Sequence, residues 1–246
     1  MIGTEIIHIE TLDSTNNYAA TMFKEAKIGS GGVIMADKQL NGRGQQGTQW
    51  QSEAGKNLTI SIVLSHSDFQ INDQVLLNFW ICTSICELLK KIGISALIKW
   101  PNDILINNKK IAGILIENQN RGSYITQSII GIGLNINQEE FEIPMCTSIK
   151  NEIKTHYTRE KILELLIKEL NELYPLFEIR DHNKLKERYL SKLWLLNEVS
   201  TFKSCEKNFE GVIKDVDSFG RICIQSQGEI KHYQVKEVYF TLRNET

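Results

Sequence analysis

The chain has 246 residues, of which 41% are hydrophobic and 24% charged, and its net charge is −2 at pH 7. This length suits one large domain, or a medium domain followed by a small one, and the composition is that of a soluble globular protein. The near-neutral charge excludes a general attraction to nucleic acid or to an anionic membrane. No stretch reaches the roughly 18 apolar residues of a membrane-spanning helix.

The N-terminal residues and the cysteines indicate a compartment. Residues 1–5 contain no basic segment followed by an apolar one, so we expect no signal peptide. The five cysteines are odd in number and form no Cys-x-x-Cys pair. Cys82 and Cys86 lie four residues apart in an apolar helical stretch, where core packing is more common than metal binding. These features favour a cytoplasmic protein.

Residues up to about position 137 predict strands interrupted by two helices. Residues 5–10 predict the first strand, and residues 13–16 supply N-cap chemistry for a helix that ends near Ala26. A longer helix with apolar residues at helical spacing runs from its N-cap candidate Asn72 to Gly93. The other strand-like runs are β-branched or alternate in polarity, and they cover residues 33–37, 58–64, 97–100, 104–106, 111–117 and 124–133. Lys109 and Lys110, with two preceding asparagines, mark a hairpin between the runs at 104–106 and 111–117.

The remainder predicts two helices and then a change of character. Thr158 caps an amphipathic helix, and a second helix covers roughly Asn183 to Leu193. After about Asn197, turn signals separate short β-like runs at residues 199–202, 209–213, 221–224, 233–235 and 237–240. This pattern is typical of a small barrel. Its balanced charge argues against a nucleic-acid role.

The segment from Gly42 to Trp50 matches the G-x-G-x-x-G dinucleotide fingerprint in letters but not in context. The fingerprint needs a strand before it and a helix directly after it. A strand precedes it, but residues 50–56 are polar and lead into the strand-like run at 58–64. The segment therefore predicts a glycine-rich loop whose backbone N–H groups and Arg43 can surround an anionic ligand.

Four polar clusters interrupt the strand-like sequence, at residues 14–16, 39–50, 99–103 with Lys110, and 131–135. Several members also have a purely structural interpretation. Ser14 can be a helix cap, Trp100 a core residue, Asn135 a turn residue and Lys109 a solubilising hairpin residue. Lys110 differs because small residues follow it, and these let another group approach closely.

Five motifs occur in order along the chain: Gly42-Arg43-Gly44-x-x-Gly47-x-x-Trp50-x-Ser52, Gly55-x-Asn57-Leu58, Lys99-Trp100-Pro101-Asn102-Asp103, Lys110-Ile111-Ala112-Gly113-Ile114-Leu115 and Gly131-Ile132-Gly133-Leu134-Asn135. In order and spacing they resemble the biotin–protein ligase family. The resemblance is strong from Ser14 to Asn137 and general in the C-terminal segment. It implies an α/β (α+β) fold, in which a mixed-sheet catalytic domain (residues 1–197) with helices on one side precedes a small SH3-like β-barrel (residues 198–246).

The resemblance also implies an activity. Members of the family form biotinyl-5′-AMP from biotin and ATP, and then transfer biotin to one lysine of a biotin carboxyl carrier domain of a biotin-dependent carboxylase. Mg²⁺ would accompany the ATP without dedicated protein ligands. We expect no nucleic-acid partner, because no helix-turn-helix precedes Ser14, and no membrane partner, because no apolar run is long enough to span a membrane. A monomer and a homodimer both stay open.

The resemblance assigns roles to individual residues. Catalytic roles fall to Lys110, Arg43 and Asp103, with Lys110 bridging the biotin carboxylate and the α-phosphate. Biotin binding falls to Ser14, Thr15, Asn16, Gln39, Gly42, Arg43, Gly44, Gln45, Lys110 and Gly113. ATP binding falls to Arg43, Trp50, Asn102, Lys110 and Asn135, and Trp50 is expected to stack on adenine.

Two positions raise questions of charge. A free lysine has a pKa of about 10.4, so deprotonating the carrier lysine at pH 7 costs roughly 4.6 kcal/mol. Asp103 is the only carboxylate in these clusters that is well placed to receive the incoming ammonium group. We hypothesise that Asp103 positions the carrier lysine. Gln45 stands where many members have a basic residue that helps to retain the adenylate. Because a charge-assisted contact is worth about 1.5–3 kcal/mol, we expect either adenylate leakage or a substitute contact from Lys110 or Arg43.

Two alternatives stay open. A lipoate–protein ligase shares the fold and the adenylate chemistry, but its loop would be expected to carry an Arg-Arg pair and consecutive glycines. A non-catalytic small-ligand binder is the alternative from another class. The presence of both Lys110 and Asp103 argues against it, because binding alone needs no lysine-orienting carboxylate.

Overall fold

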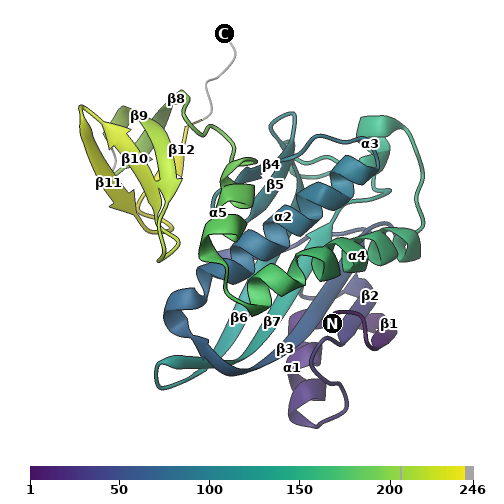
Figure 1. Cartoon of the computed structure of the whole chain (residues 1–246). Coiled ribbons are helices and arrows are strands. Elements are labelled where there is room, and N and C mark those ends of the chain that lie inside the picture. Colours follow the sequence, from purple (N-terminus) through teal and green to yellow (C-terminus); the bar gives the residue numbers. More distant parts are fainter. Residues whose placement is uncertain (206, 242–246) are drawn as a thin grey trace.

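The computed structural model describes residues 1–205 and 207–241. Two sheets organise the chain (Figure 1). A seven-stranded mixed sheet has the strand order β1-β2-β3-β7-β6-β5-β4, and a five-stranded antiparallel sheet has the order β11-β10-β9-β8-β12. The predicted α/β class, with a mixed sheet followed by a small C-terminal β domain, is confirmed. Residues 242–246 of the predicted C-terminal domain lie outside the described residues.

In the part of the chain that the structure describes, seven strands and five α-helices make up the large domain. Its strands are β1 (Ile6–Leu12), β2 (Val33–Gln39), β3 (Leu58–Gln70), β4 (Leu97–Lys99), β5 (Asp103–Ile106), β6 (Lys109–Arg121) and β7 (Tyr124–Leu134). Its helices are α1 (Thr15–Lys24), α2 (Val75–Lys91), α3 (Ile149–Ile153), α4 (Arg159–Glu178) and α5 (His182–Leu190). The small sheet contains β8 (Val199–Ser204), β9 (Lys207–Val216), β10 (Ile222–Ser226), β11 (Glu229–Tyr233) and β12 (Tyr239–Phe240).

The two faces of the large sheet carry different helices. Side chains alternate between faces along a strand, and Met35 and Ile60 belong to the main core, which α2 and α4 cover (Figure 1). Ile34 and Val63 face the other way and pack with Ala19 of α1. The expectation that all helices pack on one side is therefore wrong. The parallel pairing of β1 with β2 requires a crossover connection, and α1 supplies it on the opposite face.

The turn between β5 and β6 lies two residues earlier than predicted. Asn107 and Asn108 have φ angles of 48° and 62° and form the turn themselves. A two-residue turn with both φ values positive matches the right-handed twist of paired strands. Lys109 and Lys110 are thus the first residues of β6, and the side chain of Lys110 is two-thirds buried.

Other boundaries shift in similar ways. A 3-10 turn at Ile71–Asp73 precedes α2, so Gln74 takes the N-cap position predicted for Asn72. The strand predicted at residues 233–235 is instead β11, which ends at Tyr233. Thr158 does cap α4, where its side chain accepts a hydrogen bond from the backbone N–H of Lys161.

The small sheet packs beside α5 and the β4–β5 end of the large sheet (Figure 1). Trp100 donates its indole N–H to the carbonyl of Gly220 at 2.9 Å, which links the two sheets directly. A domain division after residue 197 stays a proposal, supported by the start of β8 at Val199. Within the described residues, no helix is long and apolar enough to cross a membrane.

Candidate active site

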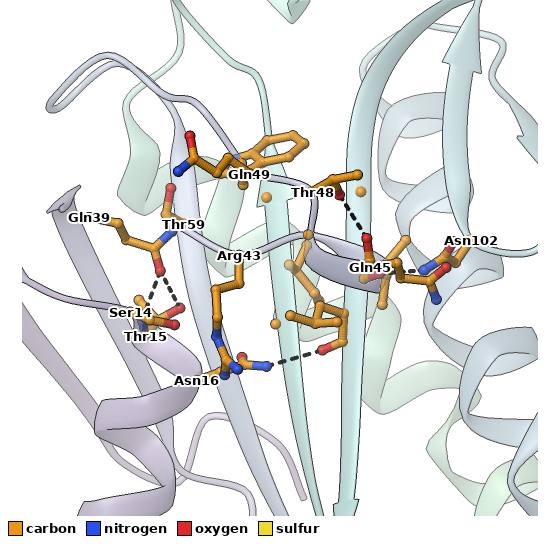
Figure 2. Close-up of a pocket in the computed structure, with 18 of the residues that line it drawn as sticks. Ser14, Thr15, Asn16, Gln39, Arg43, Gln45, Thr48, Gln49, Thr59 and Asn102 are labelled. Atoms are coloured by element: carbon orange, nitrogen blue, oxygen red, sulfur yellow. Dashed lines mark hydrogen bonds between the residues drawn. The ribbon is translucent and has the colours of Figure 1, made fainter. Parts of the chain in front are cut away.

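A cavity of about 260 Å³ opens on the face of the large sheet that carries α1 (Figure 2). Its walls come from the start of α1, the loop after β2, strands β3, β6 and β7, and the turn between β4 and β5. The predicted site residues that line it are Ser14, Thr15, Asn16, Gln39, Arg43, Gly44, Gln45, Trp50, Asn102, Asp103, Lys110 and Gly113. The fold thus brings four of the five sequence motifs to one cavity.

Glycines form the floor of this site because side chains from other segments lie directly on them. Gly113 and Gly133 are cross-strand partners in β6 and β7. A Cβ atom on Gly133 would overlap the indole of Trp50, and one on Gly131 would lie 2.5 Å from Oδ1 of Asn16. The Gly-x-Gly motif at the end of β7 is therefore required by close packing.

The start of α1 is tied to the end of β2. Oε1 of Gln39 accepts hydrogen bonds from the backbone N–H of Thr15 at 2.8 Å and from its hydroxyl at 3.0 Å (Figure 2). Ser14 occupies the N-cap position, but its side chain makes no capping bond. Ser14 is 3% exposed and lines the cavity. A ligand-binding role for Ser14 is thus better supported than a helix-capping role.

Glu117 is a site residue that sequence reasoning missed. Its Oε2 accepts from Nη2 of Arg43 at 2.7 Å and from Nδ2 of Asn16 at 2.7 Å. Asn16 also accepts a hydrogen bond from Ser61 at 2.6 Å, so its side chain is engaged with protein on both sides. Glu117 lies in the middle of a strand, 74 positions from Arg43, and no local motif marks it. In the sequence, the alternating polar residues Glu117, Gln119 and Arg121 of β6 indicate only that one side of the strand faces solvent.

Lys110 and Asp103 form an ion pair within the cavity. Nζ of Lys110 lies 2.6 Å from Oδ1 of Asp103 and 5.8 Å from the ring centroid of Trp50. Lys99, a third charge nearby, does not line the cavity, and its Nζ lies over Trp194 and Phe240. Burial lowers the pKa of Lys99, and the neighbouring charge of Asp103 opposes that shift.

A second cavity of about 630 Å³ adjoins the first, and Trp50 and Lys110 belong to both. Gly42 and Asn135, which the first cavity does not include, line the second. Nε1 of Trp50 and Oδ1 of Asn135 are buried without a hydrogen-bond partner among the described residues. Because buried polar atoms are nearly always paired, these two atoms indicate a polar ligand in the second cavity.

Asn102 was grouped with Asn135 at the nucleotide, but the two residues line different cavities. The amide of Asn102 donates to the carbonyl of Ile114 and is buried. A further wall of the second cavity comes from Gln138 and the segment from Glu140 to Cys146, which no sequence motif indicated.

The arrangement suits a reaction between two anionic groups. Lys110 lies in the wall shared by the two cavities, so its ammonium can contact a ligand in each. Arg43 lines the first cavity as a second cation. In a partly desolvated site such cations stabilise negative charge that develops during a displacement.

Comparisons with known proteins agree with this geometry. The family described as "Biotin/lipoate A/B protein ligase family" matches residues 8–135, just over half of the chain. The bifunctional ligase/repressor BirA of Bacillus spizizenii is 26% identical over 94% of this chain and 72% of that protein. The biotin–[acetyl-CoA-carboxylase] ligase of Paracoccus denitrificans is 26% identical over 93% of this chain and 97% of that protein. The biotin protein ligase of Aquifex aeolicus, solved in complex with biotin and ATP, superimposes with a TM-score of 0.78 at 25% identity, covering 97% of this chain and 100% of that chain.

Proposed function

The chain belongs to the biotin/lipoate A/B protein ligase family, and we propose that it is a biotin–protein ligase. It joins biotin and ATP to give biotinyl-5′-AMP and pyrophosphate, and then transfers the biotinyl group to a lysine of a biotin carboxyl carrier domain. The observation that carries this proposal is the position of Lys110 in the wall between two adjoining cavities. The first cavity takes the acid and the second takes the nucleotide.

The first cavity fits the ureido ring of biotin better than the dithiolane ring of lipoate. A ureido group is neutral but strongly polar, so it needs fixed donors and acceptors when it is buried. Ser14, Thr15, Gln39 and Thr59 give one end of the cavity this polar character. The hydrogen bonds from Thr15 fix the amide of Gln39. A dithiolane ring offers these polar groups neither a donor nor an acceptor.

In the first half-reaction, a carboxylate oxygen of biotin attacks the α-phosphorus of ATP and pyrophosphate leaves. Lys110 neutralises the two anions as they approach, since its Nζ can reach both cavities. Arg43 adds a second positive charge, and Glu117 fixes its guanidinium. These groups are already in place before charge develops, which is the condition for electrostatic stabilisation of a transition state.

The nucleotide cavity offers features that suit a purine nucleotide. The indole of Trp50 provides a stacking surface, and Asn135 offers a free acceptor for an exocyclic amine. Magnesium is expected to arrive on the triphosphate, where phosphate oxygens supply most ligands. Among the described residues, the one cluster of at least three metal-ligating side chains lies in the small sheet, far along the chain from this site.

In the second half-reaction, the carrier lysine attacks the acyl carbon, an amide bond forms and AMP leaves. The amine must first lose its proton, and Asp103 is the carboxylate that lines the cavity where the acyl group lies. We assign Asp103 the task of holding the incoming ammonium group. Its side chain is 32% exposed, so a lysine can reach it from solvent.

The test is product analysis with two acids and two acceptors. The enzyme is incubated with ATP, Mg²⁺ and either biotin or lipoate, and with either a biotin carboxyl carrier domain or a lipoyl domain. Mass spectrometry should show a biotinyl adduct on one lysine of the carrier domain and no lipoyl adduct. A lipoyl adduct would instead support the lipoate alternative. Binding of biotin without any AMP or adduct would support the non-catalytic binder.

A further inference from the structure

Three potential metal ligands meet in the small β domain, away from both cavities. Asp217 lies in the turn after β9, Cys223 lies on β10, and His232 is the cross-strand partner of Cys223 on β11. Oδ2 of Asp217, Sγ of Cys223 and Nδ1 of His232 all lie within 4.8 Å of one another. We call these three residues the Asp217 cluster.

We propose that the Asp217 cluster is a binding site for a divalent transition metal, with Zn²⁺ as the preferred ion. Nδ1 of His232 lies 3.3 Å from Sγ of Cys223 and 2.9 Å from Oδ2 of Asp217. A tetrahedral zinc ion with bonds of about 2.0–2.3 Å holds neighbouring ligand atoms about 3.3–3.6 Å apart. These two separations therefore need to open by only a few tenths of an ångström, and the third, between Sγ of Cys223 and Oδ2 of Asp217, is within 4.8 Å.

The mixture of ligand atoms selects the class of ion. One thiol, one imidazole and one carboxylate suit zinc and similar transition metals, whereas Mg²⁺ and Ca²⁺ prefer oxygen ligands. Cys223 as a residue is 4% exposed, and the side chain of His232 is 43% exposed. The ion would thus sit at the surface of the sheet, with its fourth position open to water.

Asp217 is held in place by the turn that contains it. Its Oδ1 accepts the backbone N–H groups of Phe219 and Arg221, both at 3.0 Å. Nε and Nη2 of Arg221 contact Oδ2, both at 2.8 Å. Carboxylates that bind metals are commonly hydrogen-bonded themselves. The guanidinium of Arg221 partly neutralises the carboxylate of Asp217. Most of the affinity for the metal must therefore come from the thiolate of Cys223 and the imidazole of His232.

Metal binding would release a proton. Burial raises the pKa of the Cys223 thiol, with smaller contributions from Asp217 and Asp215 in the same direction. Since metals bind the thiolate, a metal–sulfur bond would form as the thiol proton leaves to solvent. The bound ion would join β10, the edge strand β11 and the β9–β10 turn.

The experiment titrates the full-length protein with Co²⁺, in the presence of excess Mg²⁺, and then displaces it with Zn²⁺. We expect one tightly bound Co²⁺ with the absorption of a thiolate-to-cobalt charge transfer, and its loss on adding Zn²⁺. Cys223→Ser should abolish that absorption, and His232→Gln should weaken binding by at least about tenfold. Cys205→Ser, which removes an exposed thiol of the same domain, is the matched control. It should change neither the charge-transfer absorption nor the affinity for Co²⁺.

Two results would overturn the proposal. One is the absence of thiolate absorption in the unmodified protein, and the other is equal affinity in the unmodified protein and in both ligand variants. The His232→Gln variant keeps the test decisive even if Cys223→Ser fails to fold, because the side chain of His232 is largely at the surface. Circular dichroism establishes that each variant retains the native fold.

Discussion

Nζ of Lys110, a residue that lines both cavities, lies 2.6 Å from Oδ1 of Asp103, which lines the first. This contact joins the residue assigned to biotin activation with the residue assigned to biotin transfer. Both side chains are about one-third exposed, and ion pairs of that kind contribute little to folding stability. Substitutions of Lys110 or Asp103 should therefore change the reaction rates and leave the fold intact.

Replacement of Asp103 should separate the two half-reactions. Asp103→Asn retains the shape of the side chain but cannot hold an incoming ammonium group. We expect transfer from preformed biotinyl-5′-AMP to the carrier to slow by at least about 100-fold, with a smaller loss in adenylate formation. Single-turnover transfer measures the effect. Asp68→Asn, at an exposed carboxylate outside both cavities, is the control. If Asp103→Asn transferred biotin as fast as the unmodified enzyme, Asp103 would not be the residue that holds the carrier lysine.

A methyl group on Gly133 should displace Trp50. A Cβ at this position would overlap the indole, which the β3–β7–β6 sheet cannot accommodate by a local shift. Because Trp50 lines the second cavity, Gly133→Ala should raise the KM for ATP. Gly29→Ala serves as the control, because a Cβ at Gly29 meets nothing within 4 Å. Unchanged ATP affinity in Gly133→Ala would contradict the nucleotide role of the second cavity.

Gln45 should make retention of the adenylate weak. Arg43 and Lys110, the two cations that could substitute, are each assigned to charges of the first half-reaction and each pair with one carboxylate, Glu117 and Asp103 respectively, so neither adds a charge beyond those already counted. We therefore expect measurable release of biotinyl-5′-AMP. Gln45→Arg should slow that release by roughly tenfold to 100-fold, since a charge-assisted contact is worth about 1.5–3 kcal/mol. Rapid filtration with labelled biotin measures it. Equal release rates would show that Gln45 does not control retention.

His66 should make the fold sensitive to mild acid. Burial, with a smaller contribution from Arg180, lowers the pKa of His66 to about 4, against its ordinary value of 6.5. Between these values the unfolded chain binds a proton at His66 that the folded protein does not, so stability falls as pH decreases through this window. His66→Gln should lose less stability than the unmodified protein between pH 7 and pH 4.5 in thermal unfolding. His156→Gln is the control, and equal slopes in all three proteins would contradict this role.

The sequence predicted the features that depend on neighbouring residues. The β-branched runs became strands, Thr158 became a cap, and the segment after Gly47 formed no α-helix, as the absence of an apolar period required. The glycines at 131 and 133 were recognised as a motif, but their physical reason, contact with Asn16 and Trp50, appears only in three dimensions.

The features that were missed depend on long-range contacts. Glu117 reaches Arg43 across 74 positions, and α1 covers the opposite face because β1 pairs with β2 in parallel. Periodicity identifies the buried side of a helix but not the sheet face on which it packs. The segment from Glu140 to Cys146 has no periodic pattern, and only its position beside Asn135 shows that it lines a cavity.

Biotin-dependent exchange of pyrophosphate into ATP tests the central claim most directly. Because exchange requires reversible adenylate formation, it needs no carrier protein. We predict exchange with biotin but not with lipoate, and a loss of at least about 100-fold in Lys110→Ala, in line with the removal of a key electrostatic contact. Exchange with neither acid, or exchange that persists in Lys110→Ala, would contradict the assignment of Lys110 and of the two cavities.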